Sequence, residues 1–261
     1  MSFFMTPTCS EVIFTNESPG VAPSWRTELY DTCGTVMTLN SYIDLVESFP
    51  GYRNFTPELK TPPSPYVPMP FHGYTQQQYA QDFIDTFKNR SIDPRRVWSQ
   101  SFLVDDVLFW LKYDHDFGKQ AIFLVEDDTP ADVAARTANL TNLKASGINI
   151  IGPSIPMLIQ VGGPNNNSVV PTDFANKTKA AGLDIIAWTF ERSGPLATVK
   201  ARGEYYFSSV ADIMHYDGQY YEVLDVIVNQ IGIKAMFTDW AATVTYFANC
   251  FGLGGPQNIY N

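Results

Sequence analysis

Two spacings of apolar residues run along most of the chain. Stretches with apolar positions three and four residues apart predict helices, and short runs rich in β-branched and aromatic residues predict strands. The predicted helices cover 38–49, 74–89, 104–113, 130–145, 171–181, 220–231 and 240–249. The predicted strands cover 53–59, 97–102, 120–126, 148–151, 183–189 and 235–238. Each predicted strand is followed by a predicted helix, an order that indicates parallel strands joined by helical crossovers.

The strand–helix order favours an α/β fold of the TIM (β/α)8-barrel type. A length of 261 residues suits one such barrel. No glycine-rich phosphate loop follows a predicted strand, so a doubly wound nucleotide-binding fold is the weaker alternative. A closed barrel needs eight strands, and about six are predicted. We therefore expect residues 1–34 to form an irregular N-terminal segment, and residues 35–261 to form an incomplete barrel whose first two strands are missing.

The first predicted strand carries the most informative charged pair. Pro62 follows it closely and cannot continue a sheet ladder. Because strand side chains alternate between faces, Glu58 and Lys60 share one face, and Phe55, Pro57 and Leu59 share the other. Charged groups at the end of a buried strand are costly to desolvate. A bound metal ion or phosphate would offset this cost, so the pair is consistent with such a site. An ordinary salt-bridged strand end is the simpler interpretation, and this stretch alone favours it.

Other polar or aromatic side chains follow the predicted strands, where barrels of this type place their active sites. These candidates are Gln100, Ser101, Glu126, Asp127, Asp128, Trp188, Glu191, Arg192 and Asp239. Each has a structural explanation as well. The aspartates can cap helices, Trp188 can be core, and the Glu191–Arg192 pair can be a solvated ion pair. The three histidines, His72, His115 and His215, lie at no predicted strand end and lack metal-ligand spacing, so we expect them on the surface or in loops.

Charge and hydropathy narrow the range of partners. The formal net charge is -10 and the sequence pI is about 4.7, which argues against a nucleic-acid partner. No apolar run reaches the length of a membrane span. The first residues lack the basic and long apolar regions of a signal peptide.

Cysteines and glycosylation sequons nevertheless predict a secreted protein. Cys9 and Cys33 flank an irregular segment and are expected to form a disulfide, whereas Cys250 is expected to be a buried free thiol. Asn-x-Ser/Thr sequons begin at Asn16, Asn54, Asn89, Asn139, Asn166 and Asn176. About two such sequons would arise by chance, so their excess predicts a secreted glycoprotein. Asn54 lies inside a predicted strand and is expected not to be used.

Four segments, taken in order, resemble the glycerophosphodiester phosphodiesterases, most of all their secreted bacterial and fungal branch. The segments are Phe-Thr-Pro-Glu-Leu-Lys (55–60), Val-Trp-Ser-Gln-Ser-Phe (97–102), Ile-Ile-Ala-Trp-Thr-Phe-Glu-Arg-Ser-Gly (185–194) and Ile-Lys-Ala-Met-Phe-Thr-Asp-Trp (233–240). The similarity runs from about residue 35 to the end of the chain. The resemblance implies a TIM barrel that hydrolyses glycerophosphodiesters, small-molecule substrates, to glycerol 3-phosphate and an alcohol.

The resemblance also implies roles for three residues. Family members hold a divalent cation, Mg²⁺ or Ca²⁺, with three carboxylates, and the third of these corresponds to Glu58. Lys60 would neutralise phosphate charge, and Trp188 would line the substrate pocket. The family's His-Arg, Pro-Glu-Asn, Glu-x-Asp and His-Asp motifs have no counterpart in this sequence, so no catalytic residue is assigned. We expect the 261 residues to have little phosphodiesterase activity, and an N-terminally completed chain to be active.

Two alternatives remain at this stage. One is a catalytically inactive barrel that binds a ligand or a partner. The other is a glycosidase with two carboxylates across the barrel mouth, Glu58 with Glu126 or with Glu191.

Overall fold

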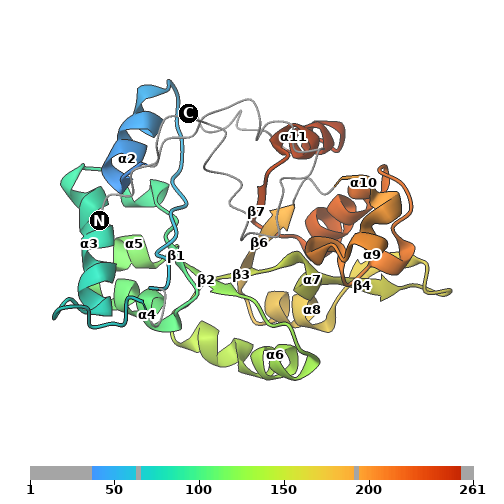
Figure 1. Ribbon diagram of the computed structural model, residues 1–261, viewed down its shortest axis with the longest axis horizontal. Coiled ribbons are helices and arrows are strands. Elements are labelled where there is room, and N and C mark those ends of the chain that lie inside the picture. The colour runs from blue at the N-terminus through green and yellow to red at the C-terminus, as the bar shows by residue number, and fades with distance from the viewer. Residues whose placement is uncertain (1–36, 63–65, 191–193, 254–261) are drawn as a thin grey trace.

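The computed structural model of the protein describes residues 37–62, 66–190 and 194–253, and an open parallel sheet forms its centre (Figure 1). The strand order in this sheet is β1-β2-β3-β6-β7, and every pairing is parallel. The strands are β1 (Gln100–Ser101), β2 (Ile122–Val125), β3 (Ile150–Pro153), β6 (Asp184–Phe190) and β7 (Ala235–Thr238). The fold is therefore of the predicted α/β barrel type, and within the described residues the sheet does not close into a barrel.

Helices surround the sheet and connect its strands. In the view of Figure 1, α2 to α5 gather at one end of the molecule, α7 to α10 at the other, and α6 runs along the lower edge. The α-helices are α2 (Leu39–Ser48), α3 (Gln76–Asn89), α4 (Val104–Tyr113), α5 (His115–Gly118), α6 (Pro130–Ala145), α7 (Ile155–Leu158), α8 (Asp173–Ala180), α9 (Val199–Arg202), α10 (Gln219–Asp225) and α11 (Ala241–Cys250). No described helix has both the length and the apolar character that crossing a bilayer would require.

Short helices and one hairpin complete the described chain. The 3-10 helices are η1 (Pro94–Arg96), η2 (Leu196–Thr198), η3 (Tyr205–Phe207) and η4 (Ala211–Ile213), and a π-helix, η5 (Val226–Ile231), continues α10. Strands β4 (Ile159–Gly162) and β5 (Ser168–Pro171) form a separate antiparallel hairpin. This hairpin projects from the end of the molecule opposite α3 (Figure 1).

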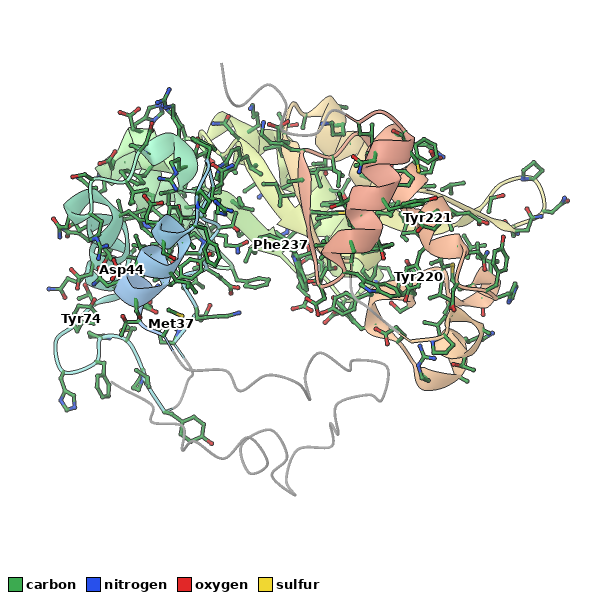
Figure 2. The ribbon with its side chains drawn as sticks, turned by 90° about the horizontal axis from the view of Figure 1, so that it is seen from above. Met37, Asp44, Tyr74, Tyr220, Tyr221 and Phe237 are labelled. Carbon is green, nitrogen blue, oxygen red and sulfur yellow. The ribbon has the colours of Figure 1, made fainter. Side chains whose placement is uncertain are left out.

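The two faces of the sheet pack differently. All four residues of β2 are buried, as expected for a parallel strand covered on both sides. The outer face belongs to the main core, into which the helices place their apolar sides. The inner face carries a smaller cluster made of Ile122, Leu124, Ile150 and Ile186, with Trp98, Phe102, Trp188 and Phe237 packed against it. Figure 2 labels Phe237, which comes from the edge strand β7.

The 53–60 segment is an exception to the predicted strands. It forms two isolated parallel bridges, Phe55 with Val97 and Glu58 with Gln100, rather than a continuous strand. The amides of Phe55 and Leu59 donate to Arg96 and Gln100 at 2.7 and 2.9 Å. Pro57 lies between them and has no N–H group, so the ladder is interrupted there. The segment still runs beside β1 as an edge of the sheet.

Two further expectations concern the cysteines. Cys250 is a free thiol, as predicted, but it is exposed rather than buried, so that part of the prediction was wrong. Cys250 is the last residue of α11. The buried residue of that helix is Phe247. Cys9 and Cys33, and with them the predicted disulfide and the 1–34 segment, lie outside the described residues.

Candidate functional site at the carboxyl rim of the sheet

Several candidate side chains meet at the carboxyl ends of the parallel strands, an edge that we call the rim. Partnered residues of neighbouring parallel strands point to the same face of a sheet. Glu58 is partnered with Gln100, and Gln100 with Ile122, which belongs to the inner cluster. This register places Glu58 on the inner face, and Lys60, two residues further on, on the same side. Phe55 and Leu59 are buried on the opposite side.

Glu58 and Lys60 form an ion pair at the rim. Lys60 Nζ lies 2.9 Å from Glu58 Oε2. The carboxylate side chain is 19% exposed, whereas the lysine side chain is 77% exposed. An exposed ion pair contributes little to stability, at most about 1 kcal/mol. The arrangement leaves a solvent-exposed ammonium group beside a shielded carboxylate.

A second polar cluster joins the ends of β2 and β3. Tyr205, in η3, donates a hydrogen bond of 2.9 Å from its hydroxyl to Glu126 Oε1. Its hydroxyl also bonds with Ser154, which directly follows β3 and is buried. Burial raises the pKa of Tyr205 to about 12, with a further contribution from Glu126, while Ser154 acts in the opposite direction. Tyr205 therefore keeps its proton at neutral pH and acts as a hydrogen-bond donor.

Trp188, on β6, packs against the inner cluster. Its Nε1 donates to the carbonyl oxygen of Gly152 at 2.8 Å, and its backbone forms a bridge with Ser154. The ring of Phe102 meets that of Trp188 edge to face, with 5.9 Å between centroids. These contacts fix the orientation of the indole, which is half-buried and offers an apolar surface near the rim.

A cleft of about 840 Å³ opens beside the Tyr205 cluster, between α6, α7, α8 and η3. Ser154 and Tyr205 contribute to both the cleft and the rim. The other polar residues that line the cleft are Asp127, Asp128, Thr129, Thr137, Gln160, Thr172, Asp173, Lys177, Ser208 and Ser209. The apolar lining residues include Val133, Met157 and Phe174. A volume of this size suits a small organic ligand.

The remaining predicted residues have structural partners or lie outside the described chain. Gln100 is buried and donates to the carbonyl oxygen of Thr56 at 3.0 Å. Asp127 pairs with Arg136 at 3.0 Å. Glu191 and Arg192 lie outside the described residues.

Capping also differs from the expectation. At α6 the cap is Thr129, whose hydroxyl accepts the amide of Asp132, so neither Asp127 nor Asp128 serves as the cap. At α11 the residue at the cap position is Trp240 rather than Asp239, and the hydroxyl of Thr238 accepts the amide of Trp240 at 2.9 Å. The three histidines are exposed and lie outside the strands, as predicted.

One buried polar network was not predicted from the sequence. Asp106, in the first turn of α4, accepts hydrogen bonds from Gln76 of α3 at 3.0 and 3.1 Å and from Ser101 of β1 at 2.8 Å. Burial raises the pKa of Asp106, and its hydrogen bonds to Gln76 and Ser101 oppose that effect. Asp106 therefore joins three elements, and Ser101 is engaged in this network on the outer side of the sheet rather than at the rim.

The described side chains do not fit a resident divalent cation. No group of three His, Cys, Asp or Glu side chains suited to a metal occurs within 37–62, 66–190 and 194–253. Glu58 lies level with Ile122 and two strand spacings away from it, and Glu126 follows four residues later. With about 4.8 Å between strands and 3.3 Å per residue, the two Cα atoms are roughly 16 Å apart.

The same spacing bears on the glycosidase alternative. Such enzymes hold their two carboxyl groups roughly 5 to 9.5 Å apart. Glu58 is paired with Lys60 and Glu126 with Tyr205, so this arrangement gives no support to a Glu58–Glu126 catalytic pair.

Comparison with known proteins finds a relative whose name describes it as extracellular. No family model matches the chain. Over 234 residues it is 44% identical to a protein of Arthroderma benhamiae named "Extracellular protein", an alignment that covers 88% of this chain and 93% of that protein.

Solved structures show a weaker likeness. A glycerophosphodiester phosphodiesterase of Parabacteroides distasonis matches with a TM-score of 0.46 and 13% identity over 82% of this chain. A structure from Agrobacterium tumefaciens, described provisionally as a glycerophosphoryl diester phosphodiesterase, matches with a TM-score of 0.49 and 17% identity over 84% of this chain. The chain spans 64% and 66% of these two structures.

Proposed function

Because this chain belongs to the same family as the extracellular protein of Arthroderma benhamiae, we propose that it is a secreted protein that binds a glycerophosphodiester at the rim. The observation that carries this proposal is the pair formed by Lys60 and Glu58 on the inner face. The exposed ammonium suits a phosphodiester anion, and the carboxylate suits the hydroxyl groups of glycerol. A glycerophosphodiester presents both groups within one small molecule. The resemblance in the 55–60 motif supports the same assignment.

Trp188 and the cleft would accommodate the rest of the ligand. The indole is held in place by Gly152 and Phe102 and would cover an apolar part of the ligand. The alcohol moiety would then extend toward the hydroxyl of Tyr205 and the adjoining cleft. In this proposal Lys60, Glu58 and Trp188 bind the ligand.

Hydrolysis to glycerol 3-phosphate and an alcohol is the reaction that the resemblance implies. In that reaction water adds to phosphorus, the bond to the leaving oxygen breaks, and that oxygen takes up a proton. Among the described rim residues, Tyr205 is a hydroxyl that is protonated at neutral pH and able to donate. The described donor set does not fit a metal ion.

Titration calorimetry with glycerophosphocholine tests the proposal, with glycerol as the uncharged control ligand. Lys60→Met keeps the length of the side chain and removes its charge. Loss of a charge-assisted hydrogen bond costs about 1.5–3 kcal/mol, so affinity should fall roughly 10- to 150-fold. Lys119→Met, at a lysine that pairs with Asp116 on α5, is the matched control and should bind normally.

Unchanged affinity in Lys60→Met would contradict the assignment of the site. The same samples, assayed for glycerol 3-phosphate with Mg²⁺, with Ca²⁺ and with EDTA, separate the two forms of the proposal. Product release identifies a phosphodiesterase, and binding without product identifies a catalytically inactive receptor.

A further inference from the structure

We infer that Asn89, Asn139, Asn166 and Asn176 carry N-linked glycans and that these glycans leave the rim uncovered. The inference rests on the secretion proposed above, but not on phosphodiester binding. All four asparagines begin a sequon and are exposed. They lie on four different surface elements, so their exposure does not come from one unusual loop.

The local geometry at Asn139 leaves its amide nitrogen suited to a glycan. Asn139 lies on α6, and its Oδ1 accepts a hydrogen bond of 3.0 Å from Asn142. A glycan is attached through Nδ2, so this bond can persist after modification. The hydroxyl-bearing member of the sequon, Thr141, is exposed as well.

Asn166 lies in the loop of the β4–β5 hairpin. Its backbone N–H donates to the carbonyl oxygen of Gly163 at 3.2 Å, so its side chain takes no part in this bond. The hairpin projects away from the sheet (Figure 1), so a branched oligosaccharide would meet few neighbouring elements. Ser168, which completes this sequon, is also exposed.

Asn176 is exposed on α8, but the hydroxyl of its sequon is not. Thr178 is buried and donates to the carbonyl oxygen of Phe174 at 2.8 Å. A transferase that must contact this hydroxyl could reach it only before α8 packs. Asn176 is therefore modified during synthesis, whereas Asn139 and Asn166 stay accessible in the folded protein.

The topology places Asn89, Asn139 and Asn176 away from the carboxyl ends of the strands. Asn89 ends α3, which leads toward the amino end of β1. Asn139 lies nine residues beyond the start of α6, about 14 Å along the helix from the rim. Asn176 is not among the residues that line the cleft. The residues that directly follow the described strands of the parallel sheet contain no sequon.

Asn54 also begins a sequon and is exposed, but it lies four residues before Glu58, so a glycan there would stand beside the rim and it is left out of the inference. The residues on either side of it are tied to the η1 region, because Arg96 donates to the carbonyl oxygen of Arg53 and Phe55 donates to that of Arg96, both at 2.7 Å. A glycan here would project beside this paired edge of the sheet.

The modification itself is a nucleophilic displacement on an oligosaccharide carried by a lipid diphosphate. The Nδ2 atom of asparagine forms a bond to the sugar C1, and the bond from C1 to the diphosphate oxygen breaks. One proton leaves Nδ2, and the lipid diphosphate is the leaving group.

The test is secretion of the full chain from a yeast host behind a supplied leader, followed by peptide N-glycosidase digestion in heavy-oxygen water. Labelled aspartate is expected at the four positions and not at position 54. Thr141→Ala should abolish the label at Asn139, whereas Thr141→Ser should retain it. Translation with microsomes gives the same readout if a variant does not fold.

Absence of label at these asparagines, or label at Asn54, would overturn the assignment. Glycerophosphocholine affinity should change less than twofold when the glycans are removed, and a larger change would overturn the inference that the rim is bare. If the glycans are present and no ligand binds, the glycan assignment stands and the proposed function fails.

Discussion

Tyr205 and Glu126 are 79 residues apart in the chain, and they meet through one hydrogen bond at the rim. Glu126 could be proposed from the sequence because it directly follows an apolar strand. Tyr205 could not, since it lies in an irregular stretch of short helices with no periodic pattern. Glu58 and Lys60 could be placed on one face from alternation alone, but the depth of the carboxylate and the exposure of the ammonium required the structure.

Tyr205→Phe should change how stability depends on pH. The folded-state pKa of Tyr205 is about 12, above the unfolded value of about 10. A raised pKa contributes stability that is present below pH 10 and is lost as the pH rises through 12. Urea unfolding between pH 8 and about 11 should therefore show a shallower loss of stability in the variant.

Tyr74 provides the control for this measurement. Burial and its bond to Asp82 also raise its pKa to about 12, so Tyr74→Phe should remove a separate share of the same dependence. Only Tyr205→Phe should also weaken glycerophosphocholine binding. Identical alkaline profiles for the wild type and Tyr205→Phe would show that the phenol is not linked to folding.

At the scale of elements, the predicted bounds agree best with the structure where the sequence carries strong start and stop signals. Helices α4 and α6 have the predicted bounds, and Thr129 and Pro130 at the start of α6 are strong local start signals. The β4–β5 hairpin was not predicted, although Gly163 begins its turn. The strand predicted at 53–59 is not continuous, because Pro57 interrupts its hydrogen-bond ladder.

Asp106 links α3, α4 and β1 through hydrogen bonds, so its removal should lower the stability of the fold. Asp106→Ala deletes the acceptor for Gln76 and Ser101 and should lower the free energy of unfolding by about 1.5–3 kcal/mol. The neighbouring Asp105→Ala is the control, because Asp105 lies in the same helical turn and is exposed. It should change stability by less than about 1 kcal/mol, through the helix dipole alone. Equal losses in the two variants, measured by urea denaturation, would contradict a special role for the Asp106 network.

For the molecule as a whole, the rim can be tested by covering it. Asp127→Asn creates an Asn-Asp-Thr sequon at residues 127–129, beside the cleft. In a secretory host this variant should gain a glycan at the rim and lose glycerophosphocholine binding. Asp127→Gln removes the same ion pair with Arg136 without creating a sequon, and it should still bind. Full binding by the glycosylated variant would place the ligand elsewhere.

The parallel order of the sheet also sets how fast the protein can fold. Its strand partners Gln100 and Ile122, Ile122 and Ile150, Ile150 and Asp184, and Ile186 and Ala235 are 22, 28, 34 and 49 residues apart. No tight turn brings any of these pairs together, so each pairing must first close a long loop against chain entropy. Chains dominated by such non-local contacts refold in roughly milliseconds to seconds rather than microseconds. Stopped-flow refolding should show this, and during that delay the wholly apolar Ile122–Val125 run stays exposed to aggregation.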